Sequence, residues 1–329
     1  MEIDIYYNPN YAKLYEKNEN GKLEVYEYTS LYGHIVYLFL KRKIESQIVS
    51  DYYDIVSPYG YGGPLIIDTT DKKKLIDGFA EQFSAYCKTN RIVSEFIRFH
   101  PIYQNALDFA SVYDVSYSRH TVGTNLKDYD DPVQAEFSKS LRKELRKAEE
   151  IGITSSVIKN PDNLEVFKKL YYETMKRNNA EQYYFFDDEY WNNIVNGFGE
   201  HVLEIQLYYC GDVIASELYF IQGRYMHAHL LGSNEKMLEL NAGVMLEATA
   251  ARWGHDNGYQ YIHHGGGRTS AEDDSLYLYK SKYGKHTKFD FYIGKKIWLQ
   301  DIYDILVEEK ESKSDNKLKG DFFPQYREI

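Results

Sequence analysis

Apolar and polar positions in the first half of the chain predict strands alternating with helices. The apolar run at residues 35–40 and the stretches 92–99 and 112–118 predict strands. Asp71 is placed to cap a helix that continues to about residue 88. The sequence SPYGYGGP at residues 57–64 predicts a loop, because glycine and proline interrupt regular structure.

The second half begins with predicted helices. Asp131-Pro132 opens one that runs to about residue 150, where Gly152 ends it, and a strand follows at 153–158. A second helix is predicted from Pro161 to about residue 177, and a shorter one at 187–195.

Three strand-like runs then follow one another, at 202–209, 213–221 and 225–231. They are joined by Cys210-Gly211-Asp212 and Gln222-Gly223-Arg224, which predict tight hairpins.

The antiparallel meander leads into a predicted helix at 241–257, ended by Gly258, and a short buried strand at 259–263. This order predicts an α+β fold with mixed, mainly antiparallel sheets flanked by helices, and it argues against a doubly wound sheet. The chain is 329 residues long, which predicts about two domains. We place them at 1–130 and 131–310, followed by a charged tail at 311–329, and we expect the stretch 308–319 to be mobile.

Composition changes this picture only in part. A formal net charge of −11 argues against a general nucleic-acid or membrane-surface coat, because phosphates and anionic lipids attract an excess of Lys and Arg. The hydrophobic content of 43% with 27% charged residues excludes wholesale disorder. The 34 tyrosines are explained by biased codon usage, with a tyrosine-lined site as the alternative.

The two cysteines, Cys87 and Cys210, form neither a disulfide framework nor a metal-type spacing. The N-terminus lacks a signal-peptide pattern, and the longest apolar run is too short to span a bilayer. We therefore expect a cytoplasmic protein without a membrane span.

Two segments are basic against this acidic background. Residues 139–147 carry five positive charges and one acidic residue, Glu144, and residues 276–298 carry six lysines and one acidic residue, Asp290. The first segment predicts a cationic helix face, which either meets phosphates or is simply solvated.

The clearest candidate for chemistry is the segment HHGGGRTSAEDDSLYLYKSKYG, residues 263–284. Three glycines after a strand allow the backbone to approach a ligand closely. Asp274 is placed to cap a helix that carries Lys280, and a lysine held there could stabilise an oxyanion in acyl transfer. The alternative is a glycine loop followed by an ordinary helix with a solvated lysine.

Four histidines lie close in sequence, at His227, His229, His263 and His264. No metal site is expected, because His263 and His264 point to opposite faces of a strand and no carboxylate or cysteine spacing supports ligation. His229 and His264 are candidates for proton transfer. The free N–H groups at the start of the helix near Gly243 are a candidate anion cradle.

Several segments together resemble the Fem family of aminoacyl transferases, which build peptidoglycan cross-bridges, and their FemAB-like and BioF2-like relatives in the GNAT superfamily. They are RKELRKAEEIGI, YETMKRN, HAHLLGS, the segment 263–284 and the first-half loop SPYGYGGPLIID. The resemblance implies two tandem GNAT-like domains with the active site in the cleft between them or in the C-terminal domain, and we place the transfer site in the C-terminal domain. It also implies transfer of an acyl or aminoacyl group to a primary amine of a cell-envelope precursor, a peptidoglycan peptide or an amino sugar.

The Fem pattern D-S-L-x-x-F-K matches Asp274, Ser275, Leu276, Tyr279 and Lys280, with tyrosine in place of phenylalanine. The resemblance implies that Lys280 is the catalytic residue that stabilises charge on the transferred carbonyl. It also implies that Arg177 clamps the acceptor phosphates. The candidate substrate-binding residues are Arg177, Tyr59, Asp68, His229, His264, Gly265, Gly266, Gly267 and Tyr279.

Two departures leave the substrates open. Fem enzymes that act on nucleotide-linked or lipid-linked muropeptides carry an early Trp and Lys segment, whereas the first tryptophan here is Trp191. The pyrophosphate pattern of acetyl-CoA enzymes, Q/R-x-x-G-x-G/A, is also missing, because Leu240 and Met245 occupy the corresponding positions around Gly243.

The expected co-substrate is aminoacyl-tRNA or acyl-CoA, and no permanently bound cofactor is expected. The acceptor is a small molecule or a lipid-linked or nucleotide-linked precursor, with the tRNA acceptor stem as a further partner and no DNA. The alternatives are an acetyl-CoA-dependent N-acetyltransferase for capsule or lipopolysaccharide sugars, and an inactive binding module in which Lys280 and Arg177 are paired off or occluded.

Overall fold

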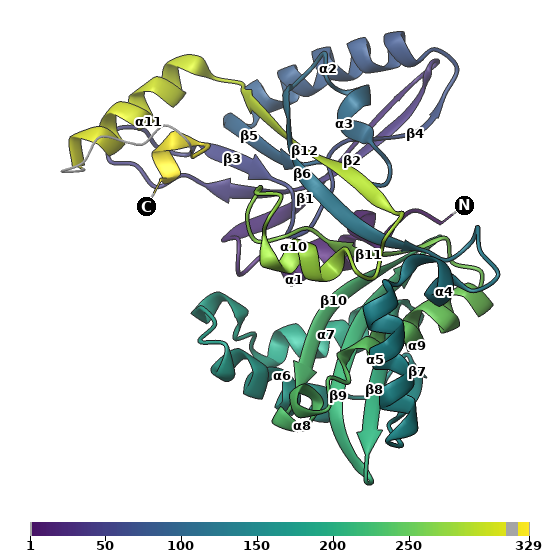
Figure 1. Cartoon of the computed structure of the whole chain (residues 1–329). Coiled ribbons are helices and arrows are strands. Elements are labelled where there is room, and N and C mark those ends of the chain that lie inside the picture. The colour runs from purple at the N-terminus through teal and green to yellow at the C-terminus, as the bar shows by residue number, and fades with distance from the viewer. Residues whose placement is uncertain (1, 314–321, 329) are drawn as a thin grey trace. The chain divides into compact units, whose positions relative to one another are not determined.

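The computed structural model describes residues 2–313 and 322–328 (Figure 1). The chain forms two compact units, and each is made of two segments. Unit 1 consists of Met1–Ile5 and Arg119–Phe289, and unit 2 consists of Tyr6–Ser118 and Asp290–Ile329. The divisions near residues 130 and 310 that we expect from the sequence are single cuts in the chain, whereas both units combine segments that are distant in sequence.

Unit 2 contains a mainly antiparallel sheet. Its strands are β1 (Gly21–Ser30), β2 (Gly33–Lys43), β3 (Tyr53–Val56), β4 (Leu65–Thr69), β5 (Ile92–Arg98) and β12 (Lys288–Ile297), which continues into it from unit 1. The order is β1-β2-β3-β5-β12, with β4 also paired to β2, and only β3 and β5 run parallel. Its helices are α1 (Pro9–Leu14), α2 (Lys72–Thr89), α3 (Asn105–Asp108) and α11 (Gln300–Lys313).

Helix α2 supplies one side of the unit 2 core. Its N-cap, Asp71, accepts a hydrogen bond from the backbone of Lys74, as the sequence predicts. Phe79 and Phe83 of α2 stack on each other and pack in one cluster with Phe39 of the sheet. Burial of these aromatic side chains fixes which face of the sheet α2 covers.

Unit 1 contains the predicted meander. Its strands are β6 (Asp114–Asn125), which enters from unit 2, β7 (Thr154–Lys159), β8 (Val202–Tyr209), β9 (Asp212–Gln222), β10 (Tyr225–Ser233) and β11 (Tyr261–Gly265). They are ordered β6-β11-β10-β9-β8-β7, and only β10 and β11 run parallel. Its helices are α4 (Pro132–Glu136), α5 (Lys139–Glu150), α6 (Glu165–Arg177), α7 (Asp188–Phe198), α8 (Glu235–Glu239), α9 (Gly243–Asp256) and α10 (Ser275–Lys280). The 3-10 turns described in the chain are Ile5–Tyr7, Gln182–Tyr184, Gly199–His201 and Gln325–Arg327.

The turns of the meander have the geometry that the sequence predicts. Cys210, Gly211 and Gly223 all have positive φ, at 52°, 89° and 65°. Helix α9 ends before Gly258, whose φ is also positive at 78°. The predicted α+β class with mainly antiparallel sheets is therefore confirmed, down to the hairpins that connect β8, β9 and β10.

Helices cover both faces of this sheet. On one face, Leu203 and Ile205 of β8 and Tyr219 of β9 share a cluster with buried residues of α5 and α9. Helix α6 lies against β9 and β10. Side chains alternate between the two faces along a strand, so the positions of β9 that share a face with Tyr219 also face α9.

Three sequence predictions need correction. The helix expected from Asp131 to residue 150 is two helices, because Phe137 is extended and the Ser138 side chain caps a new helix through the backbone of Leu141. The helix expected at Pro161 begins at Glu165, whose backbone donates to the side chain of Asn163.

The third correction concerns the stretch 308–319, which the sequence predicts to be mobile. Residues up to Lys313 belong to α11, where buried Tyr303 and Leu306 anchor the helix. Residues 314–321 lie outside the described residues, and Tyr326 beyond them is buried in the same cluster as Leu306. Over the described part of the chain, no helix has both the length and the hydrophobicity of a membrane span.

Candidate functional site

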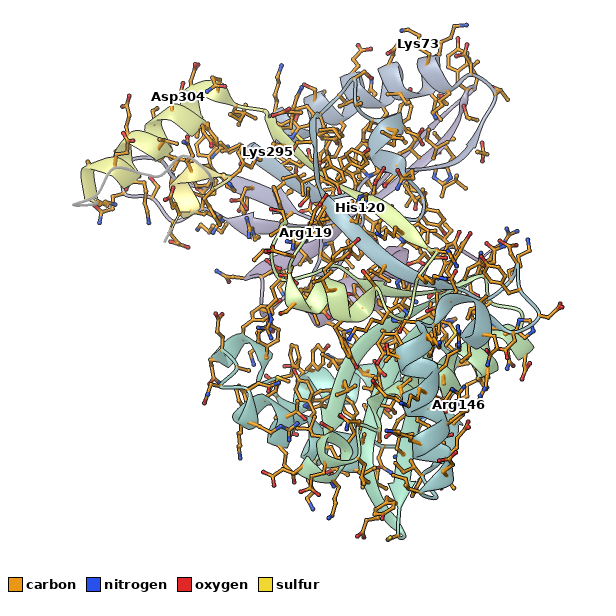
Figure 2. All side chains as sticks on the ribbon, in the orientation of Figure 1. Lys73, Arg119, His120, Arg146, Lys295 and Asp304 are labelled. Carbon is orange, nitrogen blue, oxygen red and sulfur yellow. The ribbon has the colours of Figure 1, made fainter. Side chains whose placement is uncertain are left out.

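The glycine loop after β11 is hydrogen-bonded to helix α10. Gly265 has a φ of +75°, which favours glycine. A Cβ on Gly267 would lie 2.4 Å from the Asp274 carboxylate, so this position must also stay small. Lys280 Nζ donates a hydrogen bond of 3.0 Å to the carbonyl oxygen of Gly266, and Arg119 (Figure 2) donates one of 2.9 Å to that of Gly267.

Asp274 holds both the loop and the helix. Its carboxylate accepts from the backbone N–H groups of Leu276 and Tyr277 at the start of α10. It also accepts from the backbone of Arg268 and Thr269 in the loop. These donors, first that of Tyr277, hold the pKa of Asp274 well below its usual value, so the capping group stays ionised.

Lys280 lies at the last position of α10 and is partly buried. Burial lowers the pKa of Lys280, and the nearby carboxylates of Glu247 and Glu217 oppose that shift. The ammonium therefore donates to the carbonyl of Gly266 and is stabilised electrostatically by two acidic side chains, Glu247 and Glu217.

These two acids are joined by a tyrosine. The Tyr219 hydroxyl lies 2.7 Å from Glu217 Oε2 and 3.3 Å from Glu247 Oε2. Glu217 and Tyr219 come from β9, and Glu247 comes from the facing helix α9. Burial raises the pKa of Glu247 to about 7, and burial together with repulsion by Glu247 raises the pKa of Glu217. The pair therefore holds a proton more readily than exposed carboxylates do.

His264 lies near the same carboxylate oxygen of Glu247 as the Tyr219 hydroxyl. Its Nδ1 is 3.5 Å from Glu247 Oε2, and its Nε2 is 2.8 Å from the Thr124 hydroxyl. Burial, with repulsion by Lys280, lowers the pKa of His264 to about 3, so the imidazole is neutral near pH 7.

Tyr279 links this group to the start of α9. Its hydroxyl lies 2.6 Å from that of Tyr283. A side chain at Gly243, the first residue of α9, would come within 3.6 Å of the same Tyr279 hydroxyl. Burial raises the pKa of Tyr279 to about 12. The structure thus brings Lys280, the glycine loop, His264 and Tyr279 together beside α9.

Arg177 and His229 have other partners. The Arg177 guanidinium donates to the Ser233 carbonyl at 3.0 Å and to the Ser233 hydroxyl at 2.9 Å, which ties α6 to the end of β10. His229 Nε2 lies 2.8 Å from the Tyr190 hydroxyl, and burial lowers the pKa of His229 to about 3. Neither residue has a described contact with Lys280.

Tyr59 and Asp68 belong to unit 2. The Tyr59 ring stacks on Tyr15 with 5.2 Å between centroids, and its backbone carbonyl accepts from the Tyr11 hydroxyl at 2.9 Å. Asp68 is exposed on β4 opposite His34. The candidate residues that the structure brings together therefore all come from the C-terminal half of the chain.

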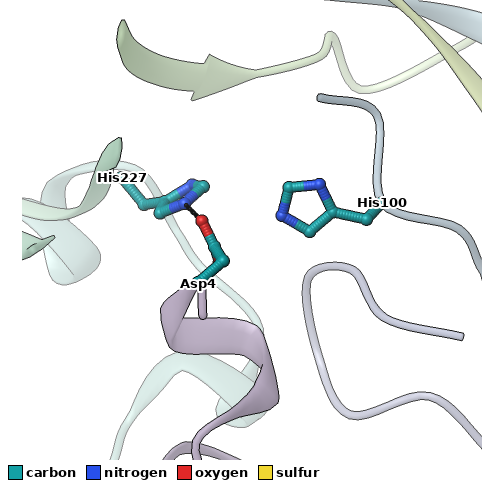
Figure 3. A group of neighbouring side chains, drawn as sticks. All are labelled: Asp4, His100 and His227. Atoms are coloured by element: carbon teal, nitrogen blue, oxygen red, sulfur yellow. Dashed lines mark hydrogen bonds and ion pairs between the residues drawn. The ribbon is translucent and has the colours of Figure 1, made fainter. Parts of the chain in front are cut away.

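The remaining histidines of the cluster have separate contacts. His227 Nε2 lies 2.7 Å from a carboxylate oxygen of buried Asp4, which ties the N-terminal segment of unit 1 to β10 (Figure 3). His263 Nε2 lies 2.9 Å from the Thr121 hydroxyl. His263 and His264 thus contact different residues of β6, as expected for neighbours that point to opposite faces.

Glu217 and Glu247 are the site residues that sequence reasoning missed. A signal was present, because Glu217 interrupts the apolar run IASELYFI and Glu247 interrupts the apolar helix sequence VMLEATAA. A charged residue inside an otherwise apolar element is costly to bury and therefore marks a paired or functional group.

Comparisons with known proteins give a family match for part of the chain and similar folds for most of it. The family described as acetyltransferase (GNAT) domain matches residues 135–281. Among solved structures, FemX is similar with a TM-score of 0.71 at 13% identity, covering 92% of this chain and 94% of that chain. The C-terminal domain of a putative lysylphosphatidylglycerol synthetase from Agrobacterium fabrum gives a TM-score of 0.56 at 12% identity, with 87% and 89% covered. L-PGS from Bacillus licheniformis gives 0.54 at 13% identity, with 89% and 93% covered.

No curated protein matches the chain by sequence. The matched segment includes every helix from α5 to α10 and contains Lys280, Glu217 and Glu247. Residues 135–281 therefore match a GNAT acetyltransferase domain. The fold of the chain is FemAB-like, as the resemblance in the sequence implies. A GNAT domain implies acyl-CoA as co-substrate.

Proposed function

We propose that this protein transfers an acyl or aminoacyl group to a primary amine of a cell-envelope precursor, a peptidoglycan peptide or an amino sugar. The observation that carries the proposal is the hydrogen bond between Lys280 Nζ and the Gly266 carbonyl, beside two acids with raised pKa values. The envelope substrate is supported by the likeness to FemX and to a putative lysylphosphatidylglycerol synthetase.

Lys280 stabilises the oxyanion in this scheme. The nitrogen of the acceptor amine forms a bond to the carbonyl carbon of the donor, and the carbonyl oxygen gains negative charge. An ammonium has three N–H donors, and the described contacts of Lys280 use one of them. The charge is therefore stabilised by a group already in place, which is the main electrostatic route to acyl transfer. Collapse of the intermediate breaks the bond to the leaving thiolate or ribose oxygen, which then takes up a proton.

The attacking amine must lose a proton, and Glu247 is the group suited to accept it. A general base works best when its pKa lies near the working pH. Burial raises the pKa of Glu247 to about 7, within that range. Glu217, whose pKa is also raised, and the Tyr219 hydroxyl between them hold the carboxylate in position.

The donor separates two versions of the proposal. The GNAT domain favours acyl-CoA, and the version with acetyl-CoA is an N-acetyltransferase for capsule or lipopolysaccharide sugars. The version with aminoacyl-tRNA is supported by the resemblance of the sequence to the Fem family. Binding of a tRNA acceptor stem would weaken steeply with salt, whereas CoA alone would raise the melting temperature in a saturable way.

The test measures transfer by the full-length protein from acetyl-CoA and from aminoacyl-tRNA to amino sugars and muropeptides. Lys280→Ala should lower kcat by about 100-fold or more, because one oxyanion donor is lost. Lys282→Ala, an exposed lysine two residues on, is the matched control and should keep full activity. Near-normal kcat in a folded Lys280→Ala protein would refute the role of Lys280. Absence of transfer with every donor would favour the binding module.

A further inference from the structure

A second site lies in unit 2, on the face of its sheet opposite helix α2. Phe39, Ile55 and Ile97 pack in the α2 cluster. Side chains alternate along a strand, so Arg42 and Arg98 project from the other face. The register places Arg42 opposite Asp54 and Lys295 opposite Phe96. Four adjacent strands, β2, β3, β5 and β12, thus bring basic and apolar side chains to one surface.

A pocket of about 350 Å³ occupies this surface. The C-terminal residues Phe322, Phe323 and Pro324 form one of its walls, and Val56, Phe96 and Ile293 supply the apolar part of the sheet side. The charged lining consists of Glu19, Arg42, Arg98, Lys295 and Arg327. All of these residues belong to unit 2.

The charges in the pocket are unequal. Four cationic side chains face one lining carboxylate, Glu19, which lies 3.7 Å from Arg42 and 3.6 Å from Arg98. Beneath them, Asp54 is 1% exposed and binds the Nε atoms of both Arg42 and Arg327. With both acids counted, the group keeps an excess of two positive charges. Asp54 orients the guanidinium groups and leaves their excess charge for a ligand.

Two of the cationic side chains, Arg98 and Lys295, are not fully paired by the described residues. Arg98 donates through one terminal nitrogen to the carbonyls of Ser57 and Pro58, while its buried Nε has no hydrogen-bond partner among the described residues. Lys295 (Figure 2) lies 5.7 Å above the Phe323 ring, and no carboxylate of the described residues forms an ion pair with it. An anionic ligand in the pocket would accept hydrogen bonds from the Lys295 ammonium and offset the excess positive charge.

We propose that this pocket binds a phosphate ester or diphosphate whose organic part lies on the apolar walls. Guanidinium groups match phosphate oxygens in geometry, and Lys295 adds a point charge. The organic part would contact Phe96 and Phe323, and a neighbouring cavity of about 490 Å³, which shares Lys295 and Phe323 with the pocket, gives it room. Nucleotides and prenyl diphosphates both have this chemistry.

The test is isothermal titration of the full-length protein with inorganic pyrophosphate, UDP and geranyl diphosphate. At least one of the two organic diphosphates should bind saturably and at least about tenfold more tightly than pyrophosphate. This ratio corresponds to a difference of about 1.4 kcal/mol in binding free energy. Preference for UDP identifies the nucleotide source, and preference for geranyl diphosphate the lipid source. Equal affinity for all three ligands would refute the part of the proposal that concerns the organic group. Absence of saturable binding up to about 10 mM, a concentration at which even weak specific binding is detected, would refute the site.

The variants separate this site from the transfer site. Lys295→Gln should weaken binding of the preferred diphosphate by about tenfold or more, because a charge-assisted contact is lost. Lys73→Gln on α2 (Figure 2) removes an exposed lysine of the same unit and is the matched control. Lys280→Ala should leave diphosphate binding unchanged. The proposal of a diphosphate site is therefore tested independently of the proposed reaction. Unchanged binding in a folded Lys295→Gln protein would overturn the assignment.

Discussion

The ammonium of Lys280 is bound to the backbone of Gly266, at 3.0 Å from its carbonyl oxygen. The Lys280 side chain is therefore held by a backbone carbonyl of the glycine loop and not by a carboxylate bonded directly to it. The loop in turn depends on Asp274, which accepts hydrogen bonds from both the loop and α10. A single capping residue thus sets the geometry of the proposed oxyanion donor.

Gly267→Ala should disturb this geometry without removing a functional group. Its Cβ would lie 2.4 Å from Asp274 Oδ1 and 2.7 Å from Cγ, so the cap must move. A displacement of about 1 Å at a catalytic group can cost about 100-fold in rate, and we expect a loss of kcat of that order. Steady-state kinetics with circular dichroism as the folding check measures it. The control is Gly62→Ala, whose Cβ would have no neighbour closer than 3.8 Å. Full activity in Gly267→Ala would contradict a role for the loop.

Glu247→Gln should change the pH dependence of transfer. Burial raises the pKa of Glu247 to about 7, so its base form is lost as pH falls through 7. The wild-type rate should therefore rise with pH through this region, and the variant should lose that limb together with about 10²-fold to 10⁴-fold in rate. A kcat/KM profile from about pH 5.5 to about pH 9 brackets the transition and tests this. Glu150→Gln, at the exposed end of α5, serves as the control. An unchanged profile in the Glu247 variant would assign the proton to another group.

Glu95 in unit 2 should make the stability of the protein depend on pH. It is fully buried and accepts from the Tyr37 hydroxyl at 2.6 Å and from the Trp298 indole at 2.8 Å. Burial raises the pKa of Glu95 from 4.5 to about 7. The folded state therefore favours the protonated form, and the associated stability is present below about pH 4.5 and lost as pH rises through about 7.

Compared with Glu95→Gln, the wild type should lose up to about 3 kcal/mol in free energy of unfolding across this window, since each pKa unit corresponds to about 1.4 kcal/mol. Urea unfolding of both proteins at about pH 4.5 and about pH 7.5, on either side of the transition, gives the difference. Parallel behaviour of the two proteins would show that Glu95 ionises with its ordinary pKa.

Gly232→Ala should destabilise unit 1 through close packing. Gly232 lies in β10, and a Cβ there would come within 2.4 Å of the backbone nitrogen of Tyr171 in α6. Backbone atoms cannot move aside as a flexible side chain can, so we expect a loss of about 1–3 kcal/mol. Thermal unfolding measures the change, again with Gly62→Ala as the control. Wild-type stability would mean that α6 is held less closely than the structure indicates.

Local chemistry makes much of this fold predictable from the sequence. The turns at Cys210-Gly211 and Gly223, the caps at Asp71 and Asp274 and the end of α9 at Gly258 all depend on residues adjacent to the feature. The break at Ser138 escapes such reasoning because a serine inside a helical pattern signals a cap only when the preceding residue, here Phe137, turns extended.

Each acid of the pair interrupts an apolar run in the sequence, but their pairing could not be predicted, for a different reason. Glu217 and Glu247 lie on separate elements, β9 and α9, and only the packing of that helix on that strand brings them to Tyr219. Periodicity places each residue on a face but does not say which two faces meet. The cap and the glycine loop of Lys280, in contrast, are its neighbours in sequence, and they made it visible there.

The two-segment composition of the units has a consequence for folding during synthesis. Once residue 289 has left the ribosome, every strand and helix described in unit 1 is available. Unit 2, most of which emerged much earlier, still lacks its own portion of β12 and all of α11. Unit 1, whose main segment starts later in the sequence, is therefore the first unit to have its whole chain synthesised. In unit 2, the edge of β5 must stay unpaired until β12 has been synthesised.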